Sequence, residues 1–116
     1  MEPVLLYITA ANREDAILVC RDLLGARLIA CANIIEQAVS LYWWQGEIEQ
    51  EKETVIIAKT VASHVDGVVE RVKALHTYDC PCVIAVPIKG GNPDYIEWIA
   101  KETSSVQGFP PGSALP

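Results

Sequence analysis

Three side chains able to bind a metal ion fall close together in the sequence. His76, Cys80 and Cys82 lie between the expected end of the second helix and the last expected strand. An imidazole and two thiolates suit Cu(I) or Zn(II), with a fourth ligand from Cys31, a glutamate or a neighbouring subunit. This spacing predicts a metal site. The alternative is that the cysteines are small apolar groups and that His76 hydrogen-bonds near a helix C-terminus.

A second group of residues could line a small-ligand cleft between subunits, because large amphipathic rings often do so at interfaces. Lys59 precedes the second helix, where it could bind an anion or form a salt bridge with a glutamate. As interface or core residues the rings need no ligand, and Cys31 in an alanine-rich strand is typical of core packing. The candidate cleft residues are Cys31, Tyr42, Trp44, Lys59, Tyr78 and Trp98.

Catalysis is not expected from this sequence. A Cys–His hydrolase needs a nucleophile, a base and a group that orients the base. The histidines are His64 and His76, and neither a nucleophile-elbow pattern nor a glycine-rich phosphate loop is present. We therefore predict that the protein is not an enzyme.

Composition and charge indicate one folded, acidic domain. Of the 116 residues, 51% are hydrophobic and 21% are charged, and the net charge is −6. Nucleic-acid binding is not expected, because the Lys and Arg residues are scattered. No apolar run reaches the roughly 18 to 20 residues of a membrane span, and no secretory signal is seen. These features predict a cytoplasmic protein with no transmembrane span, whose four cysteines are free thiols.

Most of the acidic excess lies in one expected strand. Glu47, Glu49, Glu51 and Glu53 alternate along it, so their carboxylates would share one face. This face is either a solvated edge that discourages aggregation or a rim that attracts cations.

The chain alternates between strand and helix patterns. Asn12 is a candidate N-cap for a first helix that Gly25 would end in a left-handed conformation. A capping box from Ser63 to Asp66 predicts a second helix, and Asn92-Pro93 predicts a third. Strands are expected at about residues 3–9, 28–44, 47–61 and 80–88.

The two central strands form an unusually long hairpin, with a turn at Gln45-Gly46 and a bulge near Glu36-Gln37. Arms of about 15 residues would reach roughly 50 Å, whereas a domain of this length has a radius of gyration near 13 Å. A protruding strand edge with large apolar side chains pairs with something or aggregates. We therefore expect another copy of the chain to complete the fold. The side chains are Val39, Leu41, Tyr42, Trp43, Trp44 and Ile48.

The order of the elements is β-α-β-β-α-β with an added C-terminal helix. This order predicts an α+β fold of the ferredoxin-like, split β-α-β type, in which two helices cover one face of an antiparallel sheet. The domain is expected over residues 1–103. Residues 104–116 have a linker-like composition and are expected to form a flexible tail.

Five stretches, in order and at matching spacings, resemble the CutA family of divalent-cation tolerance proteins over roughly residues 3–103. They are ARLIACANI at 26–34, SLYWWQGEIE at 40–49, ETVIIAKT at 53–60, HTYDCP at 76–81 and YIEW at 95–98. The resemblance implies a ferredoxin-like protomer and a compact homotrimer whose long hairpins pair between subunits. It also implies an architecture similar to the PII signalling proteins and a loose association with copper and other divalent ions.

The resemblance implies no secure enzymatic activity, and eukaryotic members are linked to a protein-partner role in acetylcholinesterase assembly. Two residues depart from the family pattern: Cys82 stands where members often have Glu, and Thr77 where they often have Pro. We expect a non-catalytic homotrimer that binds copper or another divalent metal ion, none of them essential, and acts in metal tolerance. The alternative is a trimeric scaffold or signalling module that binds a protein partner or a small metabolite at clefts between subunits.

Overall fold

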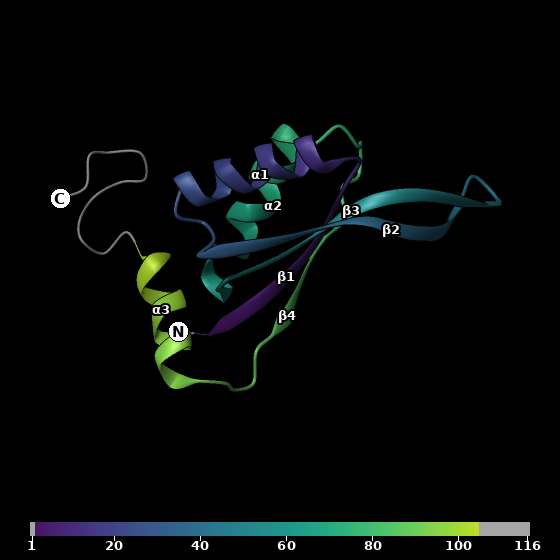
Figure 1. Ribbon diagram of the computed structural model, residues 1–116. Helices are drawn as coiled ribbons and strands as arrows, with labels where there is room; N and C mark the ends of the chain where they lie inside the picture. Colours follow the sequence, from purple (N-terminus) through teal and green to yellow (C-terminus); the bar gives the residue numbers. More distant parts are fainter. Residues whose placement is uncertain (1, 105–116) are drawn as a thin grey trace.

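The computed structural model describes residues 2–104, so the predicted tail, apart from Ser104, lies outside the described residues. Four strands and three α-helices follow the predicted order (Figure 1). No helix of this part of the chain is long and apolar enough to cross a membrane. The elements are β1 (Pro3–Ala10), α1 (Arg13–Gly25), β2 (Cys31–Trp44), β3 (Glu47–Val61), a 3-10 turn η1 (Ala62–His64), α2 (Val65–Leu75), β4 (Val83–Pro87) and α3 (Pro93–Glu102).

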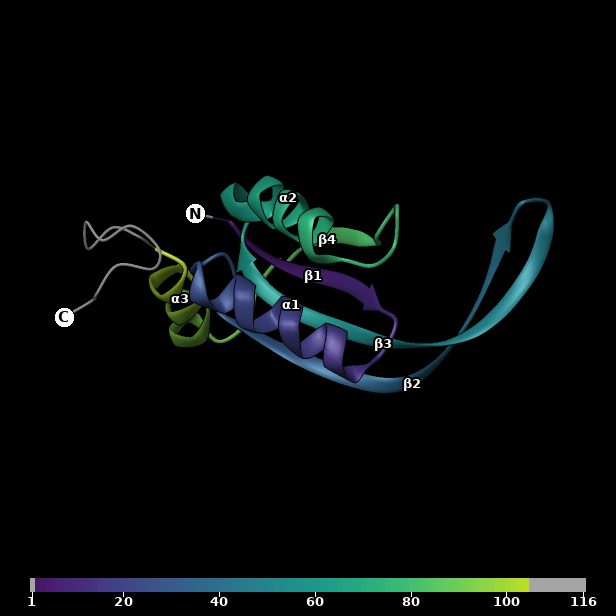
Figure 2. The same cartoon turned by 90° about the horizontal axis from the view of Figure 1, so that it is seen from above.

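The four strands form one sheet in the order β2-β3-β1-β4. Every neighbouring pair is antiparallel. Helices α1 and α2 lie side by side over one face of this sheet, and α3 stands apart at the end near the start of β1 (Figures 1 and 2). This arrangement confirms the predicted ferredoxin-like fold of the protomer.

Strand alternation places one set of side chains beneath α1 and α2. Leu6 and Ile8 of β1 and Ile56 of β3 are fully buried. They cluster with Leu23 of α1 and Val68 of α2. Burying a side chain of this size is worth about 1.5–3 kcal/mol, so this layer holds the helices to the sheet.

The opposite face of the sheet is apolar but is not covered by α1 or α2. Tyr7 pairs with Ile84, and Leu5 pairs with Val86, across β1 and β4. These residues alternate with the buried Leu6, so they point away from the two helices. Ile84 is 55% exposed and Val86 is 48% exposed. The protomer therefore presents an uncovered apolar sheet face.

The β2–β3 hairpin extends well past the helices (Figure 2), and the molecule measures 49 × 31 × 21 Å. Its turn is at the predicted Gln45-Gly46, where φ is 49° and 81°. Two positive φ values are what a two-residue type I′ hairpin loop requires. The predicted bulge is also confirmed, because the register shifts between Ile35 and Ala38 and Gln37 has a φ of 67°.

The first helix does not end as predicted. Gly25 remains in α1, and Arg27 takes the left-handed conformation with a φ of 62°. Leu28 N–H donates to Leu23 O at 2.9 Å, and Arg27 N–H donates to Leu24 O at 3.0 Å. These two bonds form a Schellman motif, which satisfies the last carbonyls of the helix. They also explain why β2 begins at Cys31 rather than near Leu28.

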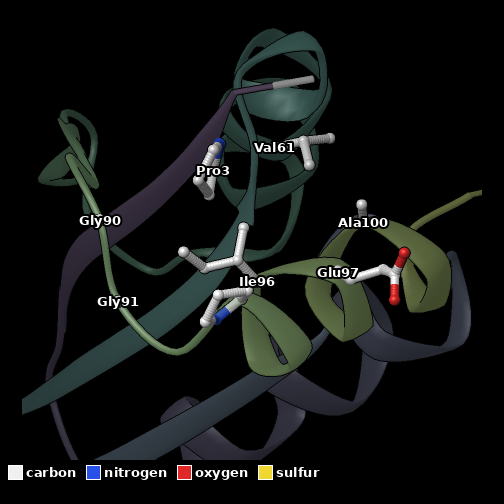
Figure 3. A pocket seen from close by; sticks show the side chains of 8 residues that line it. Pro3, Val61, Gly90, Gly91, Ile96, Glu97 and Ala100 are labelled. Carbon is white, nitrogen blue, oxygen red and sulfur yellow. The ribbon is translucent and has the colours of Figure 1, made fainter.

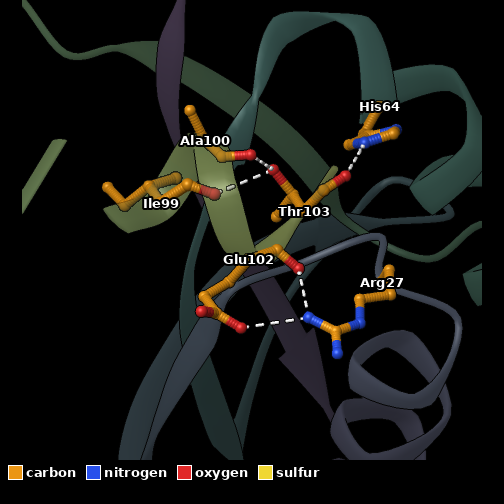
Figure 4. A network of polar contacts seen from close by, with 6 residues as sticks. All are labelled: Arg27, His64, Ile99, Ala100, Glu102 and Thr103. Atoms are coloured by element: carbon orange, nitrogen blue, oxygen red, sulfur yellow. Dashed lines mark hydrogen bonds and ion pairs between the residues drawn. The ribbon is translucent and has the colours of Figure 1, made fainter. Parts of the chain in front are cut away.

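Arg27 tolerates this conformation while its side chain holds the end of α3 (Figure 4). Its Nη1 donates to both the backbone oxygen and Oε1 of Glu102, each at 3.0 Å. His64 Nε2 lies 2.6 Å from Thr103 O, so this nitrogen carries the donated proton. The loop after α1 and the turn before α2 therefore fix α3 against the body of the protein.

Two other predicted boundaries were wrong. The capping box at Ser63 does not form, because η1 intervenes and α2 begins at Val65 without a side-chain cap. The last strand begins at Val83 rather than Cys80, consistent with Pro81, which has no N–H to donate to a sheet. The predicted caps Asn12 and Asn92 are both confirmed by side-chain bonds to backbone N–H groups.

Candidate functional site

The candidate site is a cavity of about 980 Å³ between the hairpin and the loop that leads into β4. Its described lining combines aromatic rings, carboxylates, hydroxyls and two thiols. Three of the predicted cleft residues and two of the predicted metal ligands line it. The polar and aromatic members are Tyr7, Thr9, Ser40, Tyr42, Trp44, Glu49, Glu51, Glu53, Tyr78, Asp79, Cys80 and Cys82.

The bulge in β2 decides which side chains face this cavity. Beyond it, Ser40 pairs with Glu51 and Tyr42 pairs with Glu49. Directly paired residues in an antiparallel ladder project to the same side. The alternating glutamates predicted to share a face therefore share it with Tyr42.

A phenol and a carboxylate meet inside the cavity. Tyr78 Oη donates to Glu53 Oε2 at 2.9 Å. Burial, then the hydrogen bond and the charge of Glu53, raise the pKa of Tyr78 well above its usual value. The pKa of Tyr42 is also raised, by partial loss of solvent and then by its hydrogen bond to Glu51 and the nearby carboxylates. In both phenols the nearby carboxylates therefore add to the effect of burial on the pKa.

His76 links the loop that precedes β4 to β1 through a hydrogen bond. Its Nε2 lies 2.7 Å from Thr9 O, so Nε2 carries the proton and donates it. Its Nδ1 accepts from Tyr78 N–H at 3.0 Å, and the two rings lie 4.5 Å apart. Both ring nitrogens are therefore engaged with the protein, and the one available lone pair, on Nδ1, accepts a hydrogen bond instead of facing a metal ion.

Cys80 and Cys82 are brought to the same cavity as free thiols. Cys80 is exposed and Cys82 is partly buried. Burial, followed by the charge of Glu53, raises the pKa of Cys82, while a hydrogen bond with Thr9 opposes the shift. Within residues 2–104, no group of three or more His, Cys, Asp and Glu side chains could hold a metal ion. The predicted site on His76, Cys80 and Cys82 is therefore not assembled within one protomer.

The other predicted cleft residues lie in a separate cluster beside α3. Cys31 Sγ is 3.4 Å from Tyr95 Oη and 4.0 Å from Lys59 Nζ. Lys59 Nζ lies 5.6 Å from the centre of the Tyr95 ring, and the Tyr95 and Trp98 rings are 5.4 Å apart. The hydrogen bond with Cys31 is the largest cause of the raised pKa of Tyr95. The predicted cleft is thus split between two places on the protomer.

Several residues of these sites were missed from the sequence. Tyr95 precedes Trp98 by three positions, a spacing that places both rings on one helix face. Thr9 and Tyr7 of β1 reach the cavity only because β1 lies next to β4. That proximity depends on the order of strands in the sheet, which no short pattern near either residue reveals.

A smaller cavity, of about 390 Å³, lies between α3 and the ends of β1 and β3 (Figure 3). Its lining is mostly apolar, with Glu97 as its charged side chain among the described residues. No nucleophile or metal-binding pair is found in that lining. The larger cavity is therefore the better candidate for chemistry.

Comparison with known proteins assigns this architecture to one family. The model of the family described as CutA1 divalent ion tolerance protein matches residues 4–102. The divalent-cation tolerance protein CutA of Pyrococcus horikoshii is 41% identical over 100 residues, which are 86% of this chain and 97% of that protein. The chloroplastic protein CutA 1 of Oryza sativa subsp. japonica is also 41% identical over 100 residues, 86% of this chain. This chain spans only 56% of the length of that rice relative.

A solved structure agrees with the sequence comparison. The crystal structure of CutA1 from Oryza sativa matches with a TM-score of 0.87 and 39% identity, covering 90% of this chain and 96% of that one.

Proposed function

The chain belongs to the CutA1 divalent ion tolerance family, and from that premise we propose that it is a non-catalytic homotrimer that binds copper or another divalent metal ion in metal tolerance. The family is named for divalent-cation tolerance and not for a reaction. The assembly, the ion and the role in tolerance are the parts that experiments must test.

The uncovered sheet face and the long hairpin support assembly with further copies. Tyr7, Ile84 and Val86 expose apolar surface on the sheet, and Trp43 at the hairpin end is 72% exposed. Contiguous apolar surface of this kind marks an interaction site. Closed symmetric oligomers bury it without leaving a free edge, and a trimer in which hairpins pair between subunits meets that requirement.

The thiols and carboxylates of the larger cavity are the single observation that best supports ion binding. Among the described residues that line it, four are acidic, two are cysteines and none is Lys, Arg or His. Such a lining attracts cations and supplies soft ligands. One protomer does not complete a three-ligand set with His76, so an ion that takes three or more ligands would need one of them from a neighbouring subunit.

Calorimetric titration of the reduced protein with Cu(II), Zn(II) and Cu(I) tests this proposal. Saturable binding that Cys80→Ala/Cys82→Ala abolishes is expected, and His76→Ala measures what the imidazole contributes. Affinities that are the same in all variants would reject the cavity as the metal site.

The volume of the same cavity favours one alternative, a trimeric scaffold or signalling module that binds a small metabolite or a protein partner. At about 980 Å³ it lies at the upper end of the range for small-molecule sites, and Tyr42, Trp44 and Tyr78 supply rings. A pull-down from extract with and without chelator separates the two functions, because a partner retained in chelator favours the scaffold.

We also propose that the protein is located in the cytoplasm, which fractionation of cells would test.

A further inference from the structure

The thiol pair in the larger cavity supports a more specific inference, which rests on the proposed metal-binding function. We propose that Cys80 and Cys82 alone form a two-coordinate site for a soft monovalent ion, Cu(I) or its analogue Ag(I). This site replaces the three-ligand site with His76 that the sequence predicts.

The loop that leads into β4 brings both thiols to one cavity. Pro81 separates the two cysteines, and β4 begins only at Val83. Cys80 and Cys82 both line the larger cavity, where Cys80 is exposed and Cys82 is partly buried.

Four other candidate ligands are already engaged or lie outside the cavity. His76 uses one ring nitrogen for Thr9 O and the other for a backbone N–H. Glu53 accepts the hydrogen bond of Tyr78. Cys31 lies against Lys59 in the separate cluster. Cys20 is buried in the core, where burial raises its pKa to about 11.

A site made of two thiolates without a third ligand favours metal ions that take only two ligands. Zn(II) requires four ligands in a tetrahedral arrangement. Soft thiolates favour Cu(I), and this closed-shell ion is satisfied by two sulfurs in a line. Binding forms two metal–sulfur bonds, and both thiol protons leave to solvent. The affinity should therefore rise with pH, as expected for ligands that must lose protons.

The test is an anaerobic titration of the reduced chain with Cu(I) against a coloured Cu(I) chelator, repeated with Ag(I). One ion per protomer is expected, with two sulfur neighbours in the X-ray absorption spectrum. Cys80→Ser and Cys82→Ser should each weaken binding by about 10²–10⁴-fold, because chelation by the second thiol is lost. Cys31→Ser removes a thiol outside the cavity and should leave the affinity unchanged.

His76→Gln distinguishes the two-thiol site from the predicted three-ligand site. Unchanged Cu(I) affinity supports the two-thiol site, and a loss as large as in the cysteine variants overturns it. Should the variant fail to fold, the absorption spectrum of the wild type decides, since a nitrogen neighbour contradicts the proposal. If the protein binds Zn(II) or Cu(II) but shows no thiol-dependent binding of Cu(I), the two-thiol site is rejected and the proposed metal-binding function stands. If the protein binds none of these ions, the proposed function is rejected as well.

Discussion

At the scale of residues, the pair of Tyr78 and Glu53 makes the stability depend on pH. Burial and the carboxylate raise the pKa of Tyr78, so the folded state favours the neutral phenol. An acid with a raised pKa in the folded state contributes stability that is complete below its unfolded pKa, about 10 for tyrosine. That stability is lost as the pH rises above this value.

Tyr78→Phe should lower the free energy of unfolding by about 0.5–1.5 kcal/mol at pH 7, because the hydrogen bond to Glu53 is lost. Urea unfolding at one protein concentration, at pH 7 and at a pH above the tyrosine value, measures the difference. The difference in free energy of unfolding between the wild type and Tyr78→Phe should become smaller at alkaline pH. A difference that stays constant would show that the pair does not titrate as described.

Arg27 combines an unfavourable backbone conformation with a favourable side-chain contact. Arg27→Gly removes about 1 kcal/mol of left-handed strain and also removes the contacts with Glu102, which are worth about the same at a partly exposed site. Global stability should therefore change little. Amide hydrogen exchange in α3 should become faster, because the helix loses its attachment to Arg27 and keeps only that to His64 among the side-chain contacts described above.

Arg27→Lys is the matched variant, since it keeps the strain and a positive charge but loses the paired N–H geometry. Unchanged exchange in α3 for Arg27→Gly would contradict the role given to this arginine.

At the scale of elements, the hairpin turn depends on one glycine. An added Cβ would meet no heavy atom within 4 Å at either Gly46 or Gly25, but only Gly46 has a positive φ, of 81°. Gly46→Ala should therefore destabilise the protein by about 1–2 kcal/mol, whereas Gly25→Ala in α1 should stabilise it by up to about 1 kcal/mol. Thermal unfolding at equal concentration compares the two, and a shift in the same direction for both would refute the conformational explanation.

The elements were largely predictable because their causes are local. Alternation and the Gln45-Gly46 turn define the hairpin, and Asn12 and Asn92 mark the starts of two helices. The end of α1 was not predictable, because Arg27 takes the left-handed conformation in partnership with Glu102, a residue 75 positions away. Local preference favours Gly25 there, and a distant contact overrides it.

At the scale of the whole molecule, the site was only partly predictable. Cys80 and Cys82 reach one cavity as neighbouring positions should, and Tyr42 and Tyr78 reach the same cavity. The engagement of Nε2 of His76 depends on β1, which contributes Thr9 O from 67 positions away. The separation of the predicted cleft into two clusters likewise follows from the sheet as a whole.

The uncovered sheet face predicts how substitutions affect assembly. Ile84 on this face is 55% exposed, and Leu18 on the outer side of α1 is 57% exposed. Ile84→Glu should dissociate the oligomer, because it places a charge in the proposed interface. Leu18→Glu should leave the oligomer intact, so the pair separates an effect of position from an effect of charge. Sedimentation velocity gives the comparison.

Light scattering on the wild-type protein at micromolar concentration tests the central claim most directly. In the proposed assembly, sister subunits cover the apolar sheet face and the hairpin that projects beyond the helices, so the measured mass should be three times the 12.7 kDa of the chain. A folded species of 12.7 kDa would contradict the account.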